Sequence, residues 1–107
     1  MNGFPQLPEH RFDTPSIECG VAGRNNEQGM LLRAPRSEEL EWDLEAEIAS
    51  ARCRYLEDRQ AWWIAAPYFQ TVLTIVLRSF PSVMVLGRDS DRLVSRDGRD
   101  ALQGRLF

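Results

Sequence analysis

The sequence predicts one α+β domain with a ferredoxin-like β-α-β-β-α-β core, an added N-terminal strand and a charged C-terminal tail. Its 107 residues fit a single domain with a modest hydrophobic core. Two segments, 37–50 and 68–79, repeat apolar residues at helical spacing, and the short segments around them have the composition of strands. In a ferredoxin-like layer this order gives four antiparallel strands, with both helices on one face of the sheet.

The two ends of the chain differ from the α+β core predicted for residues 17–87. Residues 1–16 contain three prolines, so we expect an extended arm there. Residues 17–34 read as a strand hairpin, because the turn-forming run RNNEQG separates two apolar segments. Residues 88–107 read as a mixed-charge tail with one short element at Leu93 and Val94.

The first predicted helix, at 37–50, is amphipathic and strongly acidic. Ser37 stands at the N-cap position, and an apolar stripe recurs every four residues at Leu40, Leu44 and Ile48. The rest of its surface carries six acids: Glu38, Glu39, Glu41, Asp43, Glu45 and Glu47. Trp42 lies on the side opposite the stripe, where we expect it to pack against a tail or to form a protein interface.

The central hairpin is predicted from two strands, 51–56 and 61–65, joined by the turn 57–60. With a four-residue turn, residue 56 pairs with 61 and residue 54 pairs with 63. The apolar side of this hairpin should face the helices and carry Cys53, Tyr55, Trp62 and Ile64. The chain then continues into the apolar helix 68–79 and a last core strand at 82–86.

The opposite side of that hairpin is the predicted binding face. It carries Trp63 with Arg52 and Arg54 beside it, and Arg33 should point the same way from its own strand. Bases can stack on an exposed aromatic ring while guanidinium groups contact phosphates, as in single-strand binding proteins. The leading hypothesis is therefore a non-enzymatic accessory protein that binds single-stranded or forked DNA. The alternatives are that an arm or a second copy covers Trp63, or that this face or the acidic helix joins a larger protein assembly.

Charge is distributed unevenly enough to permit this hypothesis. The net charge is −3, and all 13 basic residues are Arg, a usage typical of GC-rich genomes. Residues 1–47 carry 4 Arg and 10 acids, whereas residues 48–107 carry 9 Arg and 6 acids. The acidic helix should lie behind the sheet, so its charge does not exclude nucleic acid from the open face.

The segment from 29 to 86 resembles the HARP-type domain of annealing helicases. The residues that carry the resemblance are 29–35 (GMLLRAP), 51–55 (ARCRY), 59–64 (RQAWWI), and 68–80 leading into 82–85. In that family the domain assists DNA handling at forks beside an ATPase motor, so the resemblance implies an accessory role for a chain that contains no motor. The strand order is also similar to that of the RNA-recognition motif, but residues 59–65 lack the Gly of its aromatic signature.

The sequence contains few candidate residues for catalysis or for metal binding. His10 is the only His and lies in the proline-bearing arm, so neither Cys19 nor Cys53 has an evident base. These three residues do not complete the four ligands of a structural zinc site. We therefore predict no enzyme activity, no cofactor and no metal.

The expected location is cytoplasmic, with reduced thiols. The N-terminus has neither the basic nor the apolar part of a signal peptide. The uncharged run 62–77 has 16 residues and is interrupted by Pro67, whereas a membrane-spanning helix needs about 20. We expect no membrane partner.

Overall fold

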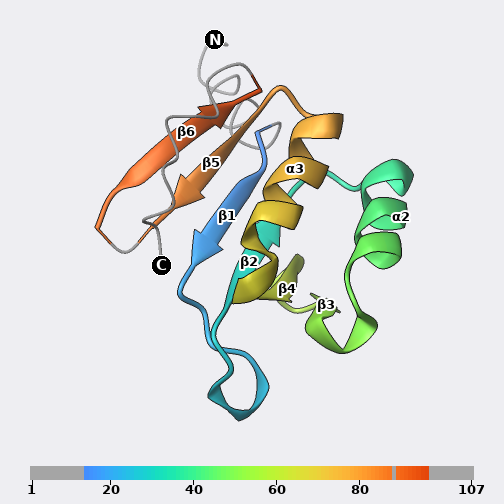
Figure 1. Cartoon of the computed structure of the whole chain (residues 1–107), viewed down its shortest axis with the longest axis vertical. Helices are drawn as coiled ribbons and strands as arrows, with labels where there is room; N and C mark the ends of the chain where they lie inside the picture. Colours follow the sequence, from blue (N-terminus) through green and yellow to red (C-terminus); the bar gives the residue numbers. More distant parts are fainter. Residues whose placement is uncertain (1–13, 88, 97–107) are drawn as a thin grey trace, which may run out of the picture.

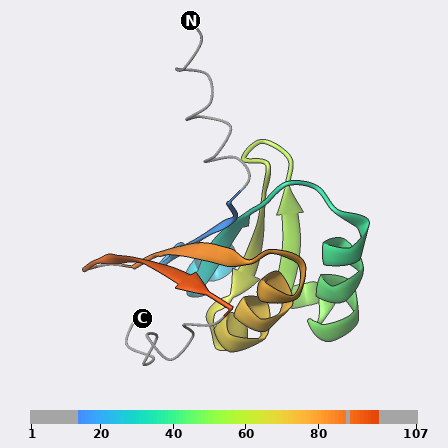
Figure 2. The same cartoon turned by 90° about the horizontal axis from the view of Figure 1, so that it is seen from above.

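A computed structural model describes residues 14–87 and 89–96 of the chain as an α+β fold with one mixed six-stranded sheet and two α-helices (Figure 1). Both helices pack on the same face of the sheet, as predicted, and their apolar side chains share one core with that face (Figures 1 and 2). The elements are β1 (Ser16–Cys19), β2 (Gly29–Arg33), α2 (Glu38–Glu47), β3 (Cys53–Leu56), β4 (Ala61–Ala65), α3 (Phe69–Ser79), β5 (Ser82–Leu86) and β6 (Asp91–Ser95).

The strand order is β3-β4-β2-β1-β5-β6, which departs from the usual ferredoxin-like order. The predicted succession of strands and helices is present from β2 to β5. However, β1 pairs antiparallel with β2 on one side and parallel with β5 on the other. The added strand therefore lies inside the sheet and separates β2 from β5, which would be neighbours in a four-stranded ferredoxin-like layer.

Both predicted arms contribute to the sheet where the structure describes them. At the N-terminal side, the amide of Met84 donates a hydrogen bond to the carbonyl of Pro15 at 2.9 Å. At the C-terminal side, β6 forms a hairpin with β5 and buries Val94 opposite Val83. The remainder of the predicted arm and tail, residues 1–13, 88 and 97–107, lies outside the described residues.

The acidic helix α2 begins as predicted and ends earlier. The Ser37 side chain accepts a hydrogen bond from the Leu40 amide at 3.3 Å, and Leu40, Leu44 and Ile48 are all buried. The helix ends at Glu47 because Ile48 has an extended backbone, with φ −126° and ψ 132°. A short 3-10 turn, Ser50–Arg52, then leads into β3.

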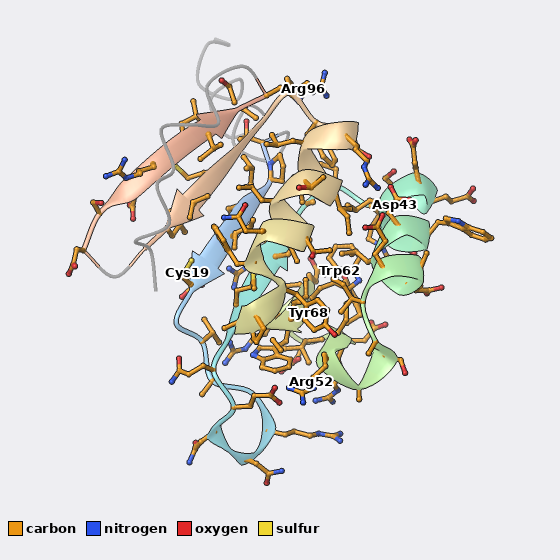
Figure 3. All side chains as sticks on the ribbon, in the orientation of Figure 1. Cys19, Asp43, Arg52, Trp62, Tyr68 and Arg96 are labelled. Carbon is orange, nitrogen blue, oxygen red and sulfur yellow. The ribbon has the colours of Figure 1, made fainter. Side chains whose placement is uncertain are left out.

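The second helix, α3, is held at its C-terminal end by two arginines. Arg96 donates from Nε to the Leu77 carbonyl at 2.7 Å and from Nη2 to the Phe80 carbonyl at 3.1 Å, so it caps carbonyls that helical bonds leave unpaired (Figure 3). Arg78 reaches across to α2 and pairs with Glu47 at 2.7 Å and Asp43 at 3.7 Å. Neither helix of the described ranges is long and apolar enough to cross a membrane.

Candidate binding surfaces

The central hairpin has the predicted register. Cys53 pairs with Ile64, Arg54 with Trp63, Tyr55 with Trp62, and Leu56 with Ala61. On the helix side, the Tyr55 and Trp62 rings meet edge to face with their centroids 4.9 Å apart. Trp63 belongs to a separate small cluster on the opposite side of the sheet. The alternation of side chains along both strands is thus confirmed.

Trp63, the predicted stacking residue, is buried. Its side chain lies in a cluster with Leu31, Ala61 and Ala65, and only 5% of the residue is exposed. The indole Nε1 donates a hydrogen bond to the Val21 carbonyl at 2.9 Å. A ring that is enclosed and hydrogen-bonded within the fold presents no face to a nucleic-acid base. The sequence left open that an arm or a second copy covers Trp63, whereas in this structure residues of an internal loop lie against the ring.

The cover is the loop between β1 and β2, residues 20–28. Gly23 in this loop and Gly29 at the start of β2 both lie against the Trp63 ring, and a Cβ built on either would come within 3.0 Å of three ring atoms. The loop turns back on itself through Asn25 and Asn26, whose φ angles are 58° and 61°. Asn tolerates this left-handed conformation better than most residues. The turn-rich composition predicted a connection here but did not indicate what it covers.

Because Trp63 is buried, the predicted arginines share no exposed surface with its ring, although Arg54 is its cross-strand partner on the same side of the sheet. Arg52 lies in the 3-10 turn before β3 rather than in the predicted strand, because its amide donates to the Ala49 carbonyl at 2.8 Å. Its guanidinium pairs with Glu27 and so ties the covering loop to this turn (Figure 3). Arg54 lies opposite Trp63 on edge strand β3, and Arg33 pairs with Glu18 at 3.2 Å.

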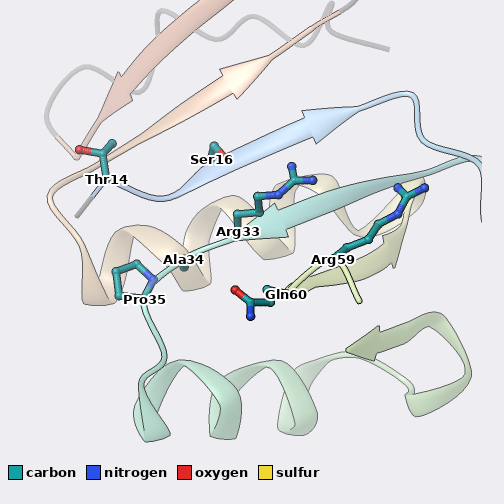
Figure 4. A pocket seen from close by; sticks show the side chains of 7 residues that line it. All are labelled: Thr14, Ser16, Arg33, Ala34, Pro35, Arg59 and Gln60. Atoms are coloured by element: carbon teal, nitrogen blue, oxygen red, sulfur yellow. The ribbon is translucent and has the colours of Figure 1, made fainter. Parts of the chain in front are cut away.

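A hollow of about 460 Å³ opens at the end of the sheet where β2 finishes (Figure 4). Arg33 contributes to it, together with Arg59 from the β3–β4 turn. The sequence placed Arg59 in a turn and in the segment that carries the resemblance, but Arg59 was not predicted as a binding residue. No local pattern could have predicted this role, since the two arginines are brought together by the pairing of β2 with β4.

The outer surface of α2 is the most exposed aromatic site in the described part of the chain. Trp42 is 74% exposed, whereas Trp62 and Trp63 are 6% and 5% exposed. Of the six acids on this helix, Glu41 pairs with Arg36 at 2.6 Å, and Asp43 and Glu47 pair with Arg78. The remaining three, Glu38, Glu39 and Glu45, are exposed and take part in no ion pair among the described residues. The predicted position of Trp42, opposite the buried stripe, is confirmed.

Both thiols pack with the hydrophobic core, Cys19 as a buried residue and Cys53 as a half-buried one. Cys19 and Cys53 are both free, and burial raises the pKa of each from its ordinary value of 9.0 to about 11, with Glu45 adding to the shift at Cys53. A thiol needs its thiolate form to act as a nucleophile or a metal ligand. Within residues 14–87 and 89–96, no group of three or more His, Cys, Asp or Glu side chains is arranged to hold a metal ion.

These pKa shifts predict slow thiol modification in the native protein. At pH 8 both thiols are protonated, so a disulfide reagent should react about a hundredfold more slowly than with an unfolded thiol. Since the folded-state pKa exceeds the unfolded value, the contribution to stability is complete below pH 9.0 and is lost as the pH rises toward about 11. The rate of thiol modification, followed by absorbance with and without denaturant, tests the first expectation. The urea concentration at the midpoint of unfolding, measured from pH 9 to pH 11, tests the second. Rapid native labelling of both thiols would contradict this placement.

Comparison of the chain with protein-family models, curated proteins and solved structures finds no match. The resemblance to the HARP-type domain therefore stays a prediction.

Proposed function

We propose that this chain is a non-enzymatic subunit that binds a protein partner through α2, with Trp42 as the central contact. The observation that carries this proposal is the 74% exposure of Trp42 in the middle of a well-packed helix. Trp is enriched among the residues that dominate interface energies, since it removes a large rigid surface from water at a small entropic cost. An exposed Trp on a helix whose other face is firmly buried is preorganised for such a contact.

The charges around Trp42 define the chemistry of the partner. Glu38, Glu39 and Glu45 lie three or four positions away, which places them next to the ring on the helix surface. Because these carboxylates have no cation beside them among the described residues, the best partner has Lys or Arg around an apolar pocket. A second copy docking through the same face, or a nucleic acid, would bring like charges together.

The test compares two alanine variants by affinity capture from the source cells, followed by titration of the purified partner. Trp42→Ala should weaken binding by more than about 2 kcal/mol, or roughly 30-fold, because the central anchor is removed. The matched control is Gln70→Ala, an exposed position on α3, which should bind as wild type. Since Trp42 is the exposed member of three Trp, its fluorescence should shift to shorter wavelength when the partner covers it.

The salt dependence of the affinity tests whether the carboxylates around Trp42 contribute to partner binding. Binding should weaken with added salt. A double variant that combines Glu39→Gln with Glu45→Gln should have a lower affinity, and its affinity should depend less on salt. Equal partner capture by wild type and Trp42→Ala would contradict the proposal, provided that both variants unfold at the same urea concentration.

Nucleic-acid binding through the sheet face opposite the helices stays a prediction, and fewer observations support it. Its stacking ring is covered, so the contacts left to it are guanidinium groups such as that of Arg54. Such binding would be sensitive to salt and insensitive to base identity.

A further inference from the structure

The hollow at the end of β2 gathers hydrogen-bond donors from three separate parts of the chain. Arg33 comes from the last position of β2, and Arg59 and Gln60 come from the β3–β4 turn. The side chains of Arg33 and Arg59 extend in the same direction (Figure 4). Thr14 and Ser16 contribute hydroxyl groups on the β1 side, and Ala34 and Pro35 supply the apolar part of the lining.

The charge within this hollow is positive. Arg33 donates to Glu18 through Nη1 alone, which leaves its Nε and Nη2 donors for another acceptor. Arg59 takes part in no ion pair among residues 14–87 and 89–96. No Asp or Glu lines the hollow, although Glu57 and Asp58 are exposed in the same turn as Arg59. The lining of the hollow therefore combines two guanidinium groups with hydroxyl groups and a side-chain amide.

We infer that this hollow is an anion site that binds a phosphate group between Arg33 and Arg59. A guanidinium fork matches the oxygen spacing of a phosphate and can donate two parallel hydrogen bonds to it. Ser16 and Gln60 line the same hollow and carry groups that can donate hydrogen bonds to an anion. The phosphate belongs either to a small phosphomonoester or to a nucleic-acid backbone, since both present the same oxygens. This site is independent of the α2 surface.

Removing the Glu18 carboxylate should have the opposite effect on phosphate binding to removing an arginine. This carboxylate lies 3.2 Å from Arg33 Nη1 and competes with an incoming anion for that guanidinium. Removing this charge should therefore strengthen phosphate binding, whereas removing either guanidinium should weaken it. A nonspecific effect of net charge would also follow these signs, so a charge-matched control at another arginine is needed.

The experiment is an amide NMR titration of the full chain with inorganic phosphate at constant ionic strength. Saturable shifts should appear at Ser16, Arg33 and Gln60. Arg33→Gln and Arg59→Gln should each weaken binding by about tenfold, because each removes a charged donor. Glu18→Gln should tighten binding. Arg24→Gln, at an exposed position in the β1–β2 loop, is the control and should leave the affinity unchanged.

A second arm distinguishes the sources of the phosphate. If a single-stranded oligonucleotide binds more tightly than inorganic phosphate and loses affinity in Arg59→Gln, the group is a backbone phosphodiester. If phenyl phosphate binds and the oligonucleotide does not, the ligand is a small phosphomonoester. Absence of saturable shifts at the three amides with every probe would overturn the site. Equal loss in Arg24→Gln and Arg59→Gln would also overturn it.

Discussion

Trp63→Ala should lower the free energy of unfolding by about 3–5 kcal/mol, which is a large fraction of the stability of a domain this size. The ring is the largest buried side chain of the small cluster on the side of the sheet opposite the helices, where Val21, Leu56 and Tyr68 pack against it. Its removal opens a cavity and leaves the Val21 carbonyl without the donor that it now has at 2.9 Å. The loop 20–28 would also lose the surface against which it packs. Urea unfolding followed by far-UV circular dichroism measures the change.

Trp42→Ala is the matched control for this experiment. It deletes the same side chain from a position that is 74% exposed, so the expected change is within about 0.5 kcal/mol. The pair of variants separates the two roles of Trp in this protein, one in folding and the other proposed in binding. Similar unfolding midpoints for the two variants would show that the loop does not enclose Trp63 in solution.

Gly29→Ala should destabilise the fold by about 1–3 kcal/mol or more, although Ala ordinarily suits a strand interior better than Gly. The added methyl group would meet three atoms of the Trp63 ring at less than 3.0 Å, so either the ring or β2 must move. The backbone at Gly29 lies in the strand and does not itself require Gly, since its φ is not positive. The effect therefore comes from the neighbouring ring, and it should depend on that ring.

A double-mutant cycle tests this dependence. In a Trp63→Leu background the clashing ring atoms are absent, so Gly29→Ala should be close to neutral and the coupling energy should be about 1–3 kcal/mol. Ala22→Ser, at an exposed position in the same loop, is the control and should have little effect in either background. Additive effects of the Gly29 and Trp63 substitutions would contradict the close packing of the two residues.

Much of the local structure could be predicted because it depends on short-range periodicity. Ser37 and the stripe at Leu40, Leu44 and Ile48 defined the buried side of α2, and hence the side on which Trp42 lies. The alternation in ARCRYL and AWWIA, combined with a four-residue turn, determined the register of β3 with β4 and the side on which Trp63 lies. These features require only neighbours along one helix or across one hairpin.

Only the tertiary structure decided what covers the open side of the sheet and where the added strand lies. The contact between Val21 and Trp63 joins residues 42 positions apart, and no periodic pattern encodes it. The insertion of β1 between β2 and β5 likewise rests on strand pairing far apart in the sequence. The sequence by itself therefore determined which residues face which side of each element. The long-range packing of the chain decided whether such a side is a core, as at Trp63, or a surface, as at Trp42.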